Sequence, residues 1–166
     1  MKTVLKNVLG LLILSSSAFC QTKDVTPHQT INPCLQTISY AVDDILLKQS
    51  LGQNLSKVDK NPVFTGGLEE LKKYFVENPL TDPKAKDLVF RVHIGFLVNC
   101  HGKFCELKII SKGKGELENL AQQVLTIVKN MPQNWQSAFV EKKPVDCYQI
   151  LSFTVIGGQL DKVSYR

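Results

Sequence analysis

The longest segment in which apolar and polar residues alternate, residues 88–99, most strongly constrains the fold of this 166-residue chain. Side chains two positions apart on a strand lie on the same face, so the segment predicts a strand with one continuous apolar face. Alternation returns after a short turn over residues 103–111, and again over residues 147–156. We therefore predict a hairpin, followed by a third strand that pairs with the first strand of the hairpin.

Segments with helical spacing lie between these strands. Apolar residues recur every three or four positions between Gly67 and Pro79, and again over residues 117–131, as in amphipathic helices. A further helix is expected over residues 33–51, where Asn32 can cap the first turn. With helices packed on one face of a small antiparallel sheet, the predicted fold class is α+β. The predicted sheet order is second–first–third strand, which leaves the third strand at an edge.

The first twenty residues have the pattern of a secretion signal. Lys2 and Lys6 precede an apolar run over residues 8–14, and small residues then lead to Cys20. The run is shorter than the roughly 20 apolar residues that a membrane-spanning helix needs. We expect cleavage after Cys20 and export to the periplasm. Secretion from the cell and lipid attachment at Cys20 are the alternatives, and the bulky Phe19 before this cysteine favours cleavage without lipid.

The chain divides into three parts on this interpretation. Residues 1–20 form the signal peptide, residues 21–60 an N-terminal extension with one helix, and residues 61–166 the domain. The chain after residue 20 is long enough for one domain with its own core.

Four cysteines follow the signal peptide, and an even number in an exported chain favours disulfides. If residues 101–104 form a four-residue loop, Cys100 faces Cys105 across the hairpin and every apolar residue falls on one side. Opposed residues lie close enough for a disulfide. We therefore predict a Cys100–Cys105 bond and, by elimination, a bond between Cys34 and Cys147.

Charge and residue spacing argue against several classes of function. The formal net charge of +5 is dispersed along the chain, and no basic stripe interleaves with aromatic residues, so we expect no nucleic-acid partner. Cys100, His101 and Cys105 crowd one tight hairpin, which suits a disulfide better than a tetrahedral metal site. The adjacent carboxylates Glu69 and Glu70 point about 100° apart on a helix. We expect no catalytic site, no metal and no cofactor.

The motifs between residues 62 and 145 come in a distinctive order. They are Pro62-x-Phe64-x-Gly66-Gly67, Phe96-x-Val98 with Gly102-Lys103, then Gly113, Gly115 and Leu117, followed by Met131-Pro132, Trp135 and Pro144-Val145. This order resembles the C-terminal domain of TonB-type energy transducers.

The resemblance implies a periplasmic domain that pairs with a short segment of an outer-membrane receptor. In that family the domain is carried by an inner-membrane protein, whereas this sequence shows neither its transmembrane anchor nor its proline-rich spacer. We therefore expect an exported TonB-like binding or adaptor module with a protein or peptide partner, such as an outer-membrane receptor, and no transmembrane span in the mature chain. The alternatives are a structural or interaction protein that kept the fold without peptide binding, and an exported enzyme.

The expected peptide site is the third strand, because an unpaired edge offers backbone donors and acceptors to an added strand. Its residues are Tyr148, Gln149, Ile150, Leu151, Ser152, Phe153, Thr154 and Val155. Gly157-Gly158 then precedes a short alternating tail, which predicts a hairpin whose second strand covers part of this edge. Removal of residues 159–166 is therefore expected to strengthen peptide binding.

Overall fold

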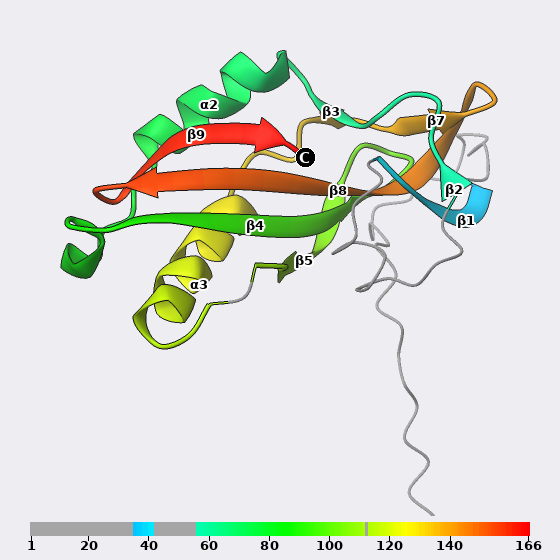
Figure 1. The fold of residues 1–166 in the computed structure, drawn as a ribbon. Helices are drawn as coiled ribbons and strands as arrows, with labels where there is room; N and C mark the ends of the chain where they lie inside the picture. Colours follow the sequence, from blue (N-terminus) through cyan, green and yellow to red (C-terminus); the bar gives the residue numbers. More distant parts are fainter. Residues whose placement is uncertain (1–34, 42–55, 112) are drawn as a thin grey trace, which may run out of the picture.

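The computed structural model describes residues 35–41, 56–111 and 113–166 (Figure 1). In chain order the described elements are β1 (Leu35–Tyr40), β2 (Ser56–Lys57), β3 (Val63–Phe64), α2 (Gly67–Glu77), a 3-10 turn (Pro83–Ala85), β4 (Val89–Val98), β5 (Phe104–Ile109), α3 (Glu116–Lys129), β6 (Trp135–Gln136), β7 (Ala138–Val140), β8 (Lys143–Ile156) and β9 (Gln159–Tyr165).

Strand β8 lies at the centre of the main sheet. On one side it pairs antiparallel with β4, which in turn pairs with β5. On its other side the first half of β8 pairs parallel with β1, and the second half pairs antiparallel with β9. With β2 and β7, these strands form a mixed, seven-stranded sheet among the described residues.

The α+β class is confirmed, but two finer expectations are wrong. The sheet is mixed rather than wholly antiparallel, because β1 runs parallel to β8, and β8 is an inner strand rather than an edge. Residues 35–40, expected in a helix, form β1 instead, while residues 42–51 lie outside the described part of the chain. Pairing with β8 explains the change, since tertiary contacts override a local helical pattern.

Helices α2 and α3 contribute to one core on one face of the sheet. From the strands this core takes Val92, Ile94, Phe96, Leu151, Phe153 and Val155, and from the helices it takes Leu71, Phe75, Leu120 and Val124, all buried. Trp135 packs edge-on against Phe96 and Phe64. The alternating apolar residues of β4 and β8 therefore face the helices, and the residues between them face the other side of the sheet.

A bulge in β5 changes the register of the hairpin from the one expected. Leu97 lies opposite Cys105, but Ile94 lies opposite Ile109, so β5 has one residue more than β4 between these pairs. The bulge lies between Cys105 and Lys108, and within it Glu106 has a φ of 52°, in the left-handed region. The predicted register, in which Cys100 faces Cys105, is therefore wrong. An inserted residue shifts every later side chain to the other face.

The turn between β4 and β5 requires glycine at one position. Gly102 has φ 73° and donates its N–H to the Asn99 carbonyl at 2.9 Å. A Cβ atom on Gly102 would overlap the carbonyl oxygen of Trp135. The hairpin turn thus lies directly against the chain that follows α3.

Candidate functional site

The edge of β8 that the sequence suggested as a peptide site is occupied. β9 pairs with β8 from Leu151 to Ile156, and β1 pairs with it up to Tyr148. Between these two strands, the Arg166 N–H donates to the Ile150 carbonyl at 3.1 Å. With β4 on the other side, β8 offers no free edge along this segment, so the expectation that the third strand is a sheet edge is wrong.

Most of the eight residues of that predicted site are buried and pack inside the protein. Leu151, Phe153 and Val155 belong to the main core, and Gln149 is buried on the same strand at 1% exposure. Tyr148 and Ile150 pack with Leu97 on the other face. Only Ser152 and Thr154 are half-buried.

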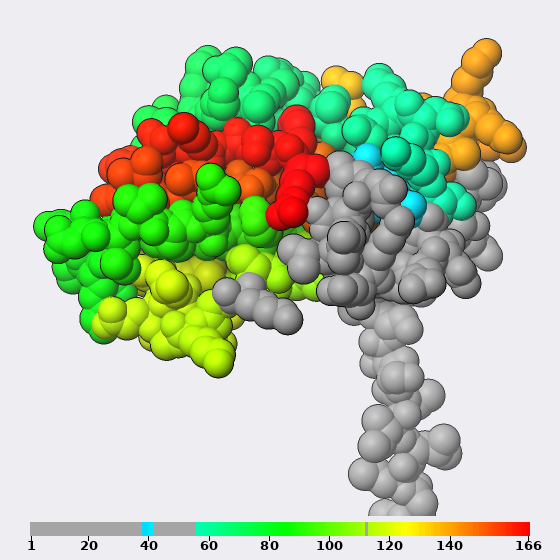
Figure 2. Space-filling model, viewed as in Figure 1, coloured from blue at the N-terminus to red at the C-terminus, as the bar shows by residue number. Residues whose placement is uncertain are grey.

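The predicted hairpin with the C-terminal tail is present, but β9 is part of the core rather than a removable cover. Leu160 and Val163 are buried at 2% and 3% exposure. The Phe64 N–H donates to the Tyr165 hydroxyl at 3.1 Å, and the Tyr165 ring contacts Trp135. Figure 2 shows β9 (red) embedded in the surface beside α2. The tail thus covers this part of the β8 edge, as the predicted hairpin implied, and it also belongs to the core. The effect of its removal on peptide binding stays a prediction.

The cysteines differ in part from the predicted pairing. Cys147 is a free, fully buried thiol, so the predicted bond between Cys34 and Cys147 is wrong. Burial, with a smaller contribution from the Asp146 carboxylate, raises the pKa of the Cys147 thiol to about 12. Cys100 and Cys105 are both disulfide-bonded. Their bond to each other stays a prediction, and Cys34 lies outside the described residues.

Strand β5 is a sheet edge with open backbone groups in the described part of the chain. The Ile110 N–H donates to the His93 carbonyl at 2.8 Å, which makes the Ile94–Ile109 pair a non-hydrogen-bonded one. The N–H and C=O of Ile109 therefore point away from β4. In the described part of the chain neither group has a hydrogen-bond partner.

The start of β5 is closed by a side chain. The Phe104 N–H donates to the side-chain Oε1 of Gln133 at 2.7 Å, and the side-chain Nε2 of Gln133 donates to the Phe104 carbonyl at 3.3 Å. The Gln133 side chain therefore replaces the backbone of a neighbouring strand at this point. Further along, at Ile109, no side chain of the described residues does so, and among these residues the edge is open to an added strand.

A groove of about 570 Å³ runs between this edge and α3. Ile109, Ala121 and Leu125 supply its apolar surface, while Lys108, Lys114 and Glu118 supply charge. An edge strand beside a helix offers both backbone pairing and room for alternate side chains of an extended peptide. Sequence reasoning missed this groove because it located the free edge on the third strand.

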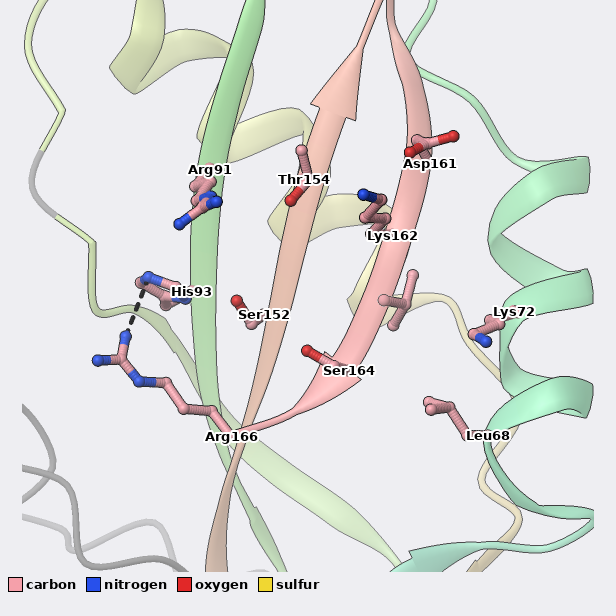
Figure 3. A pocket seen from close by; sticks show the side chains of 11 residues that line it. Leu68, Lys72, Arg91, His93, Ser152, Thr154, Asp161, Lys162, Ser164 and Arg166 are labelled. Carbon is pink, nitrogen blue, oxygen red and sulfur yellow. Dashed lines mark hydrogen bonds between the residues drawn. The ribbon is translucent and has the colours of Figure 1, made fainter.

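A second hollow, of about 690 Å³, lies on the sheet face opposite the core (Figure 3). Its floor consists of small hydroxyl residues, Ser152, Thr154 and Ser164. Longer side chains surround them: Arg91 and His93 from β4, Lys162 from β9, Lys72 from α2, and Arg166. Alternation in β4 already indicated that His93 lies outside the apolar face, but only the pairing of β9 brings Lys162 and Ser164 beside it.

The hollow is predominantly basic. Lys72 pairs with Glu69 at 2.8 Å, and Arg166 Nη1 lies 3.1 Å from His93 Nε2. A guanidinium has only donors, so Nε2 accepts in this contact. Asp161 is the one acidic side chain in the described lining. Cationic and hydroxyl groups in this arrangement suit an anionic ligand better than a metal ion.

Two absences are found within the described residues. Residues 35–41, 56–111 and 113–166 contain no group of three or more His, Cys, Asp or Glu that could hold a metal ion. No helix in this same part of the chain is long and apolar enough to cross a membrane.

Comparisons with protein families, with curated proteins and with solved structures found no match for this chain.

Proposed function

We propose that this protein is an exported binding module that takes up an extended segment of a partner protein as an additional strand beside β5. The observation that carries the proposal is the open backbone of Ile109 within the groove along α3. Added strands bind through backbone hydrogen bonds, while the pockets beside the edge select the side chains.

The other long strands are poorer candidates for strand addition. β8 is paired on both sides. The outer side of β9 lies against α2, as Figure 3 also shows. Among the described strands, β5 thus combines outward backbone groups with an adjoining groove that no helix fills.

The sequence motifs support a periplasmic location and a receptor-derived partner. Their order resembles the C-terminal domain of TonB-type transducers. We extend the proposal accordingly: the fold is TonB C-terminal-like, and the bound segment comes from the N-terminal part of an outer-membrane receptor.

The test uses ten-residue synthetic peptides from the N-termini of such receptors, titrated calorimetrically into the protein. Ile109→Pro removes the outward N–H, and proline is tolerated on an edge strand. We expect this change to weaken peptide binding about tenfold or more, since the added strand loses a hydrogen bond and clashes with the proline ring. Ile109→Val keeps the N–H and the apolar character, and it should bind like the unchanged protein.

Amide exchange locates the bound peptide independently. Strand addition should slow hydrogen exchange at the Ile109 N–H, while amides in β9 stay unaffected. Peptide binding that is equally strong in Ile109→Pro, with no slowing at Ile109, would contradict the site. Failure of all the peptides to bind would favour the alternative of an interaction protein that lacks peptide binding.

A further inference from the structure

The hollow on the open sheet face is built from two rows of residues paired across three strands. Arg91 lies opposite Thr154, and Thr154 lies opposite Lys162. One step along the strands, His93 lies opposite Ser152 and Ser152 opposite Ser164. Figure 3 shows both rows on the same face of β4, β8 and β9. The hollow thus results from small residues on the inner strand and long residues on its neighbours.

The first row has a cation at each end and a hydroxyl in the middle. Adjacent paired residues lie about 5 Å apart at Cα, so Arg91 and Lys162 are roughly 10 Å apart with Thr154 between them. Both side chains are long enough to reach over Thr154 from opposite sides. An anion above Thr154 could therefore contact Arg91, Lys162 and the hydroxyl together.

The charges of this row are not balanced within the described residues. The ion pairs found there involve Lys72, Lys73 and Lys84, and none involves Arg91 or Lys162. Arg91 and Lys162 are exposed like charges on either side of the central strand, so they repel each other weakly across roughly 10 Å. A bound anion would reverse that effect, and a multiply charged anion would do so most strongly.

We propose that this hollow binds a multiply charged oxyanion, namely a phosphate group of a small ester or of a lipid headgroup. Arg91 presents a planar fork that suits two phosphate oxygens, and Lys162 contributes a point charge from the other side. Thr154 donates its hydroxyl from the floor, and Asp161 is the acidic group that limits affinity. This site is separate from the β5 groove and does not depend on the peptide-binding proposal.

Pyrophosphate is the soluble probe, and vesicles of phosphatidylcholine with phosphatidic acid are the lipid probe. Binding to the unchanged protein is measured at low salt by calorimetry and by vesicle sedimentation. The double variant Arg91→Gln with Lys162→Gln should bind at least about tenfold more weakly. The matched control, Lys129→Gln with Lys142→Gln, removes the same two charges away from the hollow and should bind like the unchanged protein.

Two single substitutions sharpen the result. Thr154→Val keeps the shape but removes the hydroxyl, and it should weaken binding about threefold to tenfold. Asp161→Asn removes the opposing charge and should tighten binding. Retained circular dichroism and unfolding midpoints confirm that all variants fold.

The two probes distinguish the source of the phosphate group. Pyrophosphate binding that depends on Arg91 and Lys162 supports a soluble ester, and vesicle binding alone with the same dependence supports a headgroup. Equal weakening in the control pair would show non-specific attraction and overturn the site. Lack of binding to either probe would overturn it as well.

Discussion

Single residues determine the local geometry of the hairpin between β4 and β5. Gly102 allows the turn to lie against Trp135, and Glu106 accompanies the bulge that sets which β5 side chains face the core. Tyr148 donates its hydroxyl to the Glu106 carboxylate, and its pKa is raised, mainly by burial and also by this contact. The bulge is thus tied to the central strand through a side chain.

Substitution of Gly102 by alanine should destabilise the protein by about 2–3 kcal/mol, through backbone strain and overlap with the Trp135 carbonyl. Gly67→Ala is the matched control, because Gly67 also has a positive φ, of 76°, but open space at its Cβ. It should cost only about 1–2 kcal/mol of strain. Urea unfolding measures both free energies. Equal losses in the two variants would show that the overlap at Gly102 is relieved.

The buried Cys147 thiol should resist alkylation in the folded protein. Its pKa is raised to about 12, so it stays protonated at pH 8 and the thiolate nucleophile is scarce. We expect iodoacetamide to leave Cys147 unmodified until urea unfolds the chain, as read by peptide mass mapping under non-reducing conditions. The raised pKa also means that its contribution to stability is complete below pH 9 and is lost as the pH rises toward 12. Rapid labelling of Cys147 at pH 8 would contradict its burial.

At the scale of elements, β9 makes the second half of β8 an inner strand rather than a sheet edge. It covers half of one side of β8, and it adds Leu160 and Val163 to the core. The covered edge, which sequence reasoning took as a binding surface, is therefore an internal contact. In the proposed function, the edge of β5 binds the peptide instead.

Leu160→Ala should lower the free energy of unfolding by about 2–4 kcal/mol, since it leaves a cavity under β9. The neighbouring exposed Asp161→Ala should change it by less than about 0.5 kcal/mol. Removal of residues 159–166 should be more harmful than either, because it exposes the core and the β8 edge together. A truncated chain with an unchanged melting temperature would show that β9 is dispensable.

At the scale of the whole molecule, two surfaces share one sheet but use different features. The β5 groove depends on backbone groups at an edge, whereas the oxyanion hollow depends on side chains of β4, β8 and β9. The helices lie on the other face, over the core. The residues that line the two proposed sites do not overlap.

Much of the fold could be predicted from local patterns. Predicted helices near residues 67–79 and 117–131 are present as α2 and α3, and the strand predicted over 88–99 is present as β4. Apolar periodicity and the flanking glycines and prolines determine these elements. The candidate sites could not be predicted in the same way, because Thr154 and Lys162 become neighbours only through strand pairing.

The sequence by itself determined which segments are helix or long strand and which of their faces is apolar, because these depend on residues a few positions apart. Only the tertiary structure decided that Leu35–Tyr40 is a strand, that β8 is an inner strand, and that β5 bulges at Glu106. Each of these outcomes depends on backbone hydrogen bonds between residues far apart in the chain, and a local pattern does not specify the partner.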